Sequence, residues 1–109
     1  MGRGTAASVG LFAQIELRVG KIVNVKRHTG ADKLYVEDID VGEEKTRQIC
    51  SGLVEHVPIE HMQGALVVVV MNLKPVTLKG EISNGMVLAA TGQEGVSFYR
   101  VGGLRQVEH

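Results

Sequence analysis

The segment IELRVGKIVNVKRH, residues 15–28, contains the pattern that decides the fold. In its first half, apolar Ile15, Leu17 and Val19 alternate with polar side chains, as in a strand with one buried face. After Gly20 the apolar positions change phase, and a glycine at such a change indicates a bulge or a sharp bend. The segment therefore predicts one long, bent strand of the kind that serves both halves of a curled sheet.

The rest of the chain continues with short strand patterns separated by turns that contain glycine. A helix of one or two turns is expected in VPIEHMQG, where Pro58 can occupy the first helical position and Gly64 ends the helix. The near-continuous apolar run ALVVVVM is typical of a strand covered on both faces. Beyond the first strand, the expected strands are LYVEDIDVG (34–42, bent), TRQICSGL (46–53), ALVVVVM (65–71), GMVLAAT (85–91) and a further segment, Val96 to Val101.

This order predicts an all-β fold, a five-stranded Greek-key barrel of the OB type with a short helix between strands 3 and 4. OB barrels bind oligonucleotides or oligosaccharides on the face of strands 2 and 3 and with the loops that join strands 1 to 2 and 4 to 5. In this chain those loops are KRHTGADK (26–33) and NLKPVTLKGEISNG (72–85). The second loop exceeds the two to five residues of a plain hairpin, which suggests a function for it.

Length and composition are those of one domain. The 109 residues are 44% hydrophobic, so we expect a flexible leader over 1–12 and a single OB domain over 13–109. The longest apolar run, Ala65 to Met71, is far shorter than the about 20 residues of a membrane helix, so no membrane partner is expected. The single cysteine, Cys50, cannot form an intramolecular disulfide, and a cytoplasmic location is expected.

Charge is balanced overall but segregated along the chain. There are 12 basic and 12 acidic residues, which argues against a binder that relies on bulk positive charge. Between Arg18 and Lys33 there are five basic residues and one acidic residue, whereas Glu37 to Glu44 holds five acidic residues and no basic one. This distribution permits a positive face on a neutral molecule, although two solvated strand and turn surfaces are the simpler alternative.

The sequence offers no constellation that supports catalysis or metal binding. Cys50 lies in an apolar strand, and no third group is evident to orient a Cys50–His56 pair. His56 and His61 are five residues apart, which fits neither a helical zinc site nor a zinc finger. Neither the calcium-loop spacing nor a glycine-rich phosphate-binding motif is present. We therefore expect no enzyme activity, no cofactor and no metal.

The polar residues of the 72–85 loop allow two interpretations. Lys74 and Lys79 can simply keep a long loop soluble, and asparagine and serine commonly stabilise turns through their own backbone. The same lysines can neutralise phosphates, and Asn72, Ser83 and Asn84 carry groups that hydrogen-bond to sugars, phosphates or base edges. Both roles can coexist in one loop.

Four segments, in this order and spacing, resemble a known family. They are LRVGKIV, RHTGADKLYVEDIDVGE, RQICSGLVEHVP and NLKPVTLKGEISNGMVLAA, and together they cover roughly residues 13 to 91. They are similar to the tRNA-binding domain, which occurs as a stand-alone structure-specific tRNA-binding protein and as the C-terminal appendage of methionyl-tRNA synthetases. It also occurs in the synthetase-complex cofactor that is the precursor of endothelial-monocyte-activating polypeptide.

The resemblance implies a non-catalytic module that recognises tRNA by shape at its outer corner and assists an aminoacyl-tRNA synthetase in cis or in trans. The alternative function is a protein-interaction module of the OB class: a synthetase-complex scaffold, a cytokine-like signal or an export-type chaperone. Met86 has an alternative role as a core residue. The resemblance implies RNA contacts for Lys33, Asn72, Lys74, Lys79, Ser83 and Met86, and Arg18, Lys26 and Arg47 are added as weaker electrostatic candidates.

Three departures from the family pattern affect these expectations. Thr29 and Gly30 replace a proline-containing turn, which leaves that loop less rigid, and Asn84 stands where glutamine is common. Only 18 residues follow Thr91, whereas the cytokine-like branch carries a long extension that packs as a mock partner. The surface that such an extension covers is then exposed or covered by a second copy, so a homodimer is expected.

Overall fold

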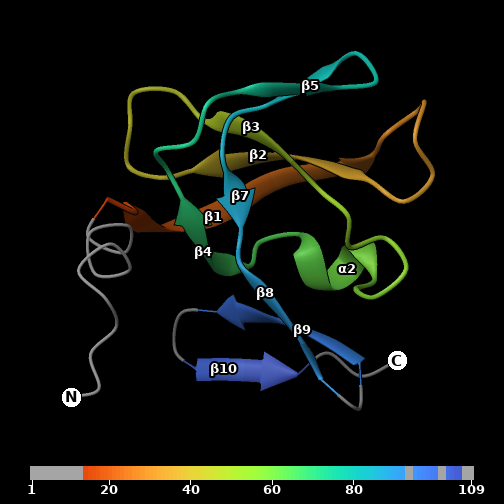
Figure 1. The fold of residues 1–109 in the computed structure, drawn as a ribbon. Coiled ribbons are helices and arrows are strands. Elements are labelled where there is room, and N and C mark those ends of the chain that lie inside the picture. The colour runs from red at the N-terminus through yellow and green to blue at the C-terminus, as the bar shows by residue number, and fades with distance from the viewer. Residues whose placement is uncertain (1–13, 93–94, 101–102, 107–109) are drawn as a thin grey trace, which may run out of the picture.

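The structure, a computed structural model, describes residues 14–92, 95–100 and 103–106, and its regular elements are strands and one short helix (Figure 1). The leader expected over residues 1–12 lies outside the described ranges. The elements are β1 (Leu17–Arg27), β2 (Tyr35–Asp40), β3 (Arg47–Ser51), α2 (Ile59–Met62), β4 (Leu66–Val70), β5 (Val76–Leu78), β6 (Glu81–Ser83), β7 (Met86–Val87), β8 (Ala89–Gly92), β9 (Gly95–Arg100) and β10 (Gly103–Gln106).

Strands β1 to β4 and the β6–β7 segment form a nearly closed barrel. The long strand β1 pairs antiparallel with β2 on one side and with β4 on the other, while β3 pairs with β2 and β7 with β4. The barrel approaches closure where the β6–β7 segment meets β3. There the Asn84 N–H donates to the Gln48 carbonyl at 2.8 Å, and the Cys50 N–H donates to Ser83 Oγ at 2.9 Å. With α2 between β3 and β4, this arrangement confirms the predicted OB-like barrel.

The bend of β1 is present, but its physical origin differs from the prediction. The register between β1 and β2 shifts between Ile22 and Asn24, two residues after the glycine that the phase change indicated. Gly20 has another role, because a Cβ atom at this position would lie 2.6 Å from Ile39 Cγ2 and 2.9 Å from Val41 Cγ1. Glycine at this position therefore leaves room for the side chains of Ile39 and Val41 to pack against the backbone of β1.

The core fills the barrel and extends to α2, whose Met62 is fully buried. Tyr35 is also fully buried, and its hydroxyl donates to the Val57 carbonyl at 2.5 Å, so its polar end is satisfied inside the core. Pro58 is the residue that precedes the helix, one position earlier than predicted, and Gly64 follows the helix with a φ of +79°. The main members of the core are Ile22, Val25, Tyr35, Ile39, Val41, Ile49, Leu53, Val57, Met62, Val67, Val69, Met71 and Val87.

Three expectations about individual segments need correction. The 72–85 segment is not an irregular loop, because β5 and β6 pair within it as a separate two-stranded sheet. Strand β4 is not covered on both faces throughout, since Leu66 is exposed. The C-terminal tail contains β10, which pairs with β9, and β9 contacts the edge of β4. Val101, the last residue of the expected final strand, lies outside the described ranges.

Within the described residues, no helix is both long enough and apolar enough to cross a membrane.

Candidate nucleic-acid interface

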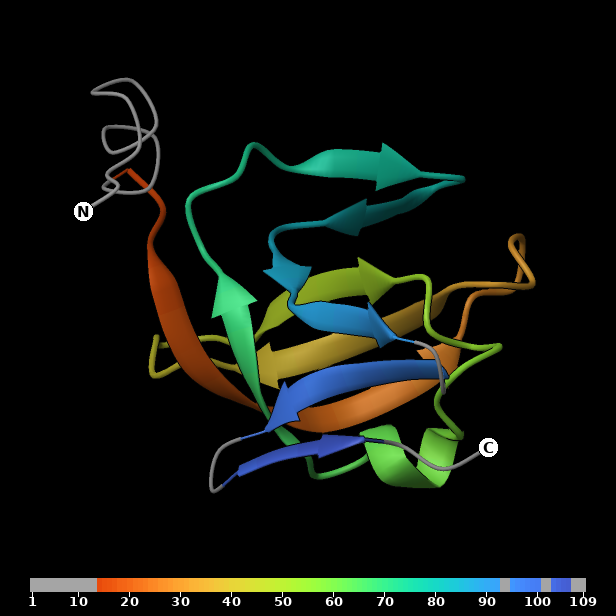
Figure 2. The ribbon, with the colours of Figure 1, turned by 60° about the horizontal axis from the view of Figure 1, so that its bottom comes forward.

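The β5–β6 hairpin and the loop between β1 and β2 lie next to each other at one end of the barrel (Figures 1 and 2). The loop spans residues 28–34 and carries Lys33, and the hairpin carries Lys79 at its turn. The two tips are close, because a Cβ atom on Gly30 would lie 3.9 Å from the Lys79 carbonyl oxygen. Two basic residues that are 46 positions apart in the sequence are thus placed on neighbouring loops.

The turn of the hairpin consists of Lys79 and Gly80. Leu78 and Glu81 are paired on either side of it, and both turn residues have a positive φ, +50° for Lys79 and +93° for Gly80. Positive φ at both central residues is the requirement of a type I′ turn, where asparagine followed by glycine is preferred. Among the described non-glycine residues, Lys79 alone has a positive φ. The chain thus keeps a lysine at a position whose backbone geometry disfavours it.

Four predicted lysines are exposed. Lys79 is at the turn of the hairpin, Lys74 lies in the segment that leads from β4 into β5, Lys33 lies in the β1–β2 loop, and Lys26 is near the end of β1. Among the described residues, none of these four ammonium groups forms an ion pair. Their charges are therefore available to an anionic partner.

Asn72 and Ser83 use their polar groups within the protein. The side-chain oxygen of Asn72 accepts a hydrogen bond from the Glu16 N–H at 2.9 Å, and its amide nitrogen donates to the Gln14 carbonyl, which ties the segment before β1 to the end of β4. Ser83 is only 3% exposed. Its hydroxyl accepts from the Cys50 N–H and donates to the Gly85 carbonyl at 3.2 Å. In this structure both side chains hold the ends of the hairpin to the barrel.

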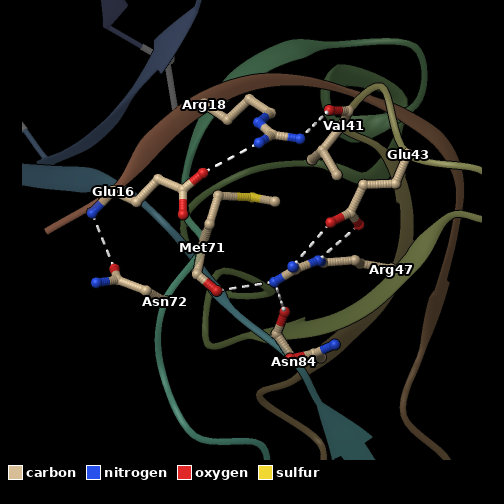
Figure 3. A network of polar contacts seen from close by, with 8 residues as sticks. All are labelled: Glu16, Arg18, Val41, Glu43, Arg47, Met71, Asn72 and Asn84. Atoms are coloured by element: carbon tan, nitrogen blue, oxygen red, sulfur yellow. Dashed lines mark hydrogen bonds and ion pairs between the residues drawn. The ribbon is translucent and has the colours of Figure 1, made fainter.

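Arg47 is neutralised by Glu43 at the opposite end of the barrel (Figure 3). Its guanidinium contacts both carboxylate oxygens of Glu43 at 2.9 Å and also donates to the carbonyls of Met71 at 2.8 Å and Asn84 at 3.3 Å. The hydrogen bond between the two side chains lowers the pKa of Glu43 and raises the pKa of Arg47. Most of the donors of Arg47 are occupied, which leaves it little capacity for an additional anion.

Arg18 lies at the same end of the barrel as Arg47, and its guanidinium also has partners within the protein. It donates to the Val41 carbonyl at 3.2 Å and to the carboxylate of Glu16 at 3.0 Å (Figure 3). Both arginines at this end of the barrel therefore form ion pairs with glutamates. The four lysines form no ion pair among the described residues.

Met86 lies at the surface, 47% exposed, so the core role considered for it is not what the structure shows. It pairs in register with Val70 of β4, which in turn pairs with exposed Leu17 of β1. Because directly opposite residues of antiparallel strands share a face, Met86 and Leu17 lie on the same outer side of the barrel. We call this surface the outer face and define it by Leu17, Val19, Leu66 and Met86, which are all exposed.

Three other features of the described residues were candidates for ligand binding, catalysis or metal binding, and each has little support. An open hollow beside Arg47 is lined by residues 43–48 together with Ile82 and Asn84, and its lining mixes acidic and basic side chains. Burial raises the pKa of the Cys50 thiol, which disfavours its nucleophilic thiolate form. No group of three or more His, Cys, Asp or Glu side chains in the described ranges is arranged to hold a metal ion.

Two residues of this region carry no motif that would identify them from the sequence. Arg27 is exposed beside Lys26 at the end of β1 and adds a positive charge close to the loop. His28 is buried between the loop and the hairpin, where it hydrogen-bonds to both. The segment KRH shows their polarity, but only the pairing of distant segments shows what they contact.

Comparison with known proteins gives one family and several relatives. A family model described as "Putative tRNA binding domain" matches residues 17–103. Aminoacyl tRNA synthase complex-interacting multifunctional protein 1 of Cricetulus griseus is 49% identical over 84 residues, which are 77% of this chain and 23% of that protein. The cytoplasmic methionine–tRNA ligase of Caenorhabditis elegans is 43% identical over 105 residues, which are 92% of this chain and 12% of that protein.

A solved structure has the same architecture over most of its length. The MetRS related protein from Pyrococcus horikoshii superposes with a TM-score of 0.79 at 28% sequence identity, and the match covers 91% of each chain. The chain spans less than a quarter of the length of the two curated relatives, so the similarity to them concerns one domain.

Proposed function

The chain belongs to the tRNA-binding domain family, and from this premise we propose that it is a non-catalytic module that binds tRNA by shape at the outer corner. The observation that carries the proposal is the set of four exposed lysines at the turn of the hairpin, in the segment that leads into the hairpin, on the β1–β2 loop and near the end of β1. They are Lys26, Lys33, Lys74 and Lys79. No ion pair within the described residues neutralises them.

In this proposal the lysines neutralise phosphates of the RNA backbone. Contacts to phosphates position a protein on a nucleic acid without reading its sequence, which suits recognition by shape. Lysines on two neighbouring loops meet phosphates at a separation that the fold sets, so a folded tRNA with the matching spacing is preferred over an RNA of another shape. Asn72, Ser83, Arg18 and Arg47 contribute by holding the hairpin and the end of the barrel in place.

We further propose that the module works beside an aminoacyl-tRNA synthetase in the cytoplasm, joined to it covalently or as a separate partner. Two relatives support this: one is named as interacting with the synthase complex, and the other is a cytoplasmic ligase that contains a similar domain. Because the formal net charge is zero, electrostatic attraction to RNA is modest for a single copy, and a partner adds avidity.

A homodimer is the partner that we propose for the free chain. The outer face exposes Leu17, Val19, Leu66 and Met86, and an apolar surface on adjacent strands is suited to an isologous contact with itself. Zero formal net charge means that two copies do not repel each other through net charge. The mass from sedimentation equilibrium tests this proposal directly: twice the chain mass supports it, and a chain-sized mass at micromolar concentration contradicts it.

Filter binding of intact tRNA over a salt series tests the RNA proposal. If about four phosphates are neutralised, the logarithm of affinity falls with the logarithm of salt concentration with a slope of roughly −3 to −3.5. The double variant Lys74→Ala, Lys79→Ala is expected to weaken binding and to reduce the slope by about 2, with little change in melting temperature.

Lys45→Ala is the matched control, because Lys45 is exposed in the β2–β3 turn, at the end of the barrel opposite the hairpin turn. It should leave the affinity close to that of the unmodified chain. Equal binding of intact tRNA and of a simple hairpin RNA would contradict recognition by shape. Absence of any salt slope, together with sedimentation with a synthetase in nuclease-treated extract, would favour the protein-interaction module instead.

A further inference from the structure

His28 connects the two loops of the candidate interface. Its side chain is buried, 6% exposed, and both ring nitrogens have partners. The Gly30 N–H donates to Nδ1 at 2.8 Å, so Nδ1 carries no hydrogen. Nε2 therefore carries the hydrogen of a neutral ring, and it lies 2.8 Å from the Leu78 carbonyl oxygen, to which it donates. The two hydrogen bonds require one neutral tautomer.

The positions of Gly30 and Leu78 show which parts of the candidate interface His28 connects. Gly30 lies in the β1–β2 loop that carries Lys33, and Leu78 directly precedes Lys79 in the turn of the hairpin. The base of the loop is closed by two backbone bonds, from the His28 N–H to the Leu34 carbonyl at 2.9 Å and from the Leu34 N–H to the Ala31 carbonyl at 3.1 Å. A single side chain thus links two loops that each carry an exposed lysine.

The hairpin needs such a contact because its own sheet has only two strands, and an isolated hairpin is marginally stable. Its other described side-chain hydrogen bonds to the barrel all go to β3, from Gln48 to Glu81 and Ile82 and between Cys50 and Ser83. In the described part of the chain, the bond from His28 is the hydrogen bond that joins the hairpin to the β1–β2 loop. Without the His28 bond, the described side-chain hydrogen bonds between the hairpin and the barrel would all involve β3.

We propose that His28 is a positioning residue for RNA binding, which holds the hairpin against the β1–β2 loop so that Lys79 and Lys33 present their charges at a constant separation. This inference rests on the proposed function. Lysine side chains on loops that are already held in place lose less conformational freedom when RNA binds. Lysines on mobile loops must be ordered during binding, which costs affinity. Ordering costs of this kind, about 0.5–1.5 kcal/mol per immobilised side chain, correspond to an affinity loss of roughly 3- to 10-fold.

Two variants test the two side-chain hydrogen bonds of His28 separately, because each variant can keep only one of them. In His28→Gln the side-chain amide nitrogen can donate to the Leu78 carbonyl in place of Nε2. In His28→Asn the side-chain oxygen can accept from the Gly30 N–H in place of Nδ1, but the shorter side chain does not reach the hairpin. We expect His28→Gln to bind intact tRNA within about 2-fold of the unmodified chain, and His28→Asn to bind roughly 3- to 10-fold more weakly. Both affinities are measured where melting curves show each variant fully folded.

A double-mutant cycle with Lys79→Ala distinguishes positioning from a general loss of structure. If His28 acts through Lys79, then His28→Asn has little further effect on affinity in the Lys79→Ala background. Equal affinities of His28→Asn and the unmodified chain, or fully additive effects in the cycle, would overturn the inference while tRNA binding itself stands. If the unmodified chain shows no salt-dependent tRNA binding, the proposed function fails and the inference fails with it.

Discussion

Glu37 is a carboxyl group enclosed in the barrel between β1 and β3. It is fully buried on β2, where the Ser51 hydroxyl donates a hydrogen bond to Oε2, and Oε1 has no hydrogen-bond partner among the described residues. Burial raises the pKa of Glu37 to about 8, and the hydrogen bond from Ser51 opposes this only in part. The group is therefore mostly protonated near neutral pH, and the acidic segment that begins with it carries less charge than the sequence implies.

The raised pKa makes the free energy of unfolding depend on pH. The folded chain keeps the proton on Glu37 up to about pH 8, whereas the unfolded chain releases it near 4.5. The contribution of this group is thus fully present below the unfolded value and is lost as the pH rises toward the folded value, a change on the order of a few kcal/mol. Glu37→Gln is expected to remove this loss, which urea unfolding at about pH 5.5 and about pH 8.5 will measure.

Glu44→Gln, at an exposed position of the β2–β3 turn, provides the control and should keep the pH dependence of the unmodified chain. An unchanged pH dependence in Glu37→Gln would show that another group is responsible.

Single residues were only partly predictable from the sequence. The pattern NLKP with the later KG and SNG identifies Asn72, Lys79 and Ser83 as polar residues of one segment. It does not show that Ser83 is buried against β3 while Lys79 is exposed, because that difference depends on which side of the hairpin faces the barrel. Placement of the polar groups required the pairing of β5 with β6 and the contact of β6 with β3.

At the scale of elements, the hairpin β5–β6 is the feature that the strand patterns miss. Its strands have three residues each, and period-2 alternation is hard to recognise over so short a span. The lysine at the turn also makes the hairpin hard to predict from the sequence, since Lys-Gly is not among the dipeptides that indicate a type I′ turn. The element that carries Lys79 at its turn was therefore expected as a loop.

Lys79→Asn is predicted to stabilise the fold and to weaken RNA binding. Asparagine adopts positive φ at lower cost than lysine, so the variant should gain about 0.5–1 kcal/mol, which raises the melting temperature by a few degrees. The loss of one phosphate contact should reduce the salt slope by about 1. Calorimetry and filter binding measure the two effects separately.

A lower melting temperature for Lys79→Asn would show instead that the lysine side chain stabilises the turn. Unchanged tRNA affinity would remove Lys79 from the interface.

At the scale of the whole molecule, the four candidate lysines and the outer face lie on different parts of the fold, although the hairpin also exposes apolar Val76 and Ile82. Lys79 lies at the turn of the hairpin, Lys74 lies just before the hairpin and Lys33 lies on the adjacent loop. The apolar side chains of the outer face come from β1, β4 and β7. A second copy on the outer face would leave the hairpins of both copies accessible. Two linked binding sites then act on RNA with a higher effective affinity than one.

Val19→Glu is predicted to give a monomer. Val19 is 51% exposed on the outer face, so the substitution does not disturb the core, but it places like charges opposite each other in a symmetric contact. Sedimentation equilibrium should change from twice the chain mass to the chain mass, and tRNA affinity should fall at least about 10-fold as avidity is lost.

Val76→Glu is the matched control for the mass, because this valine is equally exposed, at 52%, but lies on the hairpin. It should leave the mass of the dimer unchanged. A dimer that persists in Val19→Glu would place the contact elsewhere on the chain.

The pattern of apolar, proline and glycine residues is a property of neighbours along the chain, and it was sufficient to predict the strands of the barrel and the helix between β3 and β4. The order and spacing of four motifs indicated the family. Contacts between distant segments are not recorded in that pattern. The bonds from Ser51 to Glu37, from Cys50 to Ser83, from Arg47 to the Met71 and Asn84 carbonyls and from His28 to the hairpin join residues 14 to 50 positions apart. Only closure of the barrel brings these groups together, and it thereby decides which charges remain available for a partner.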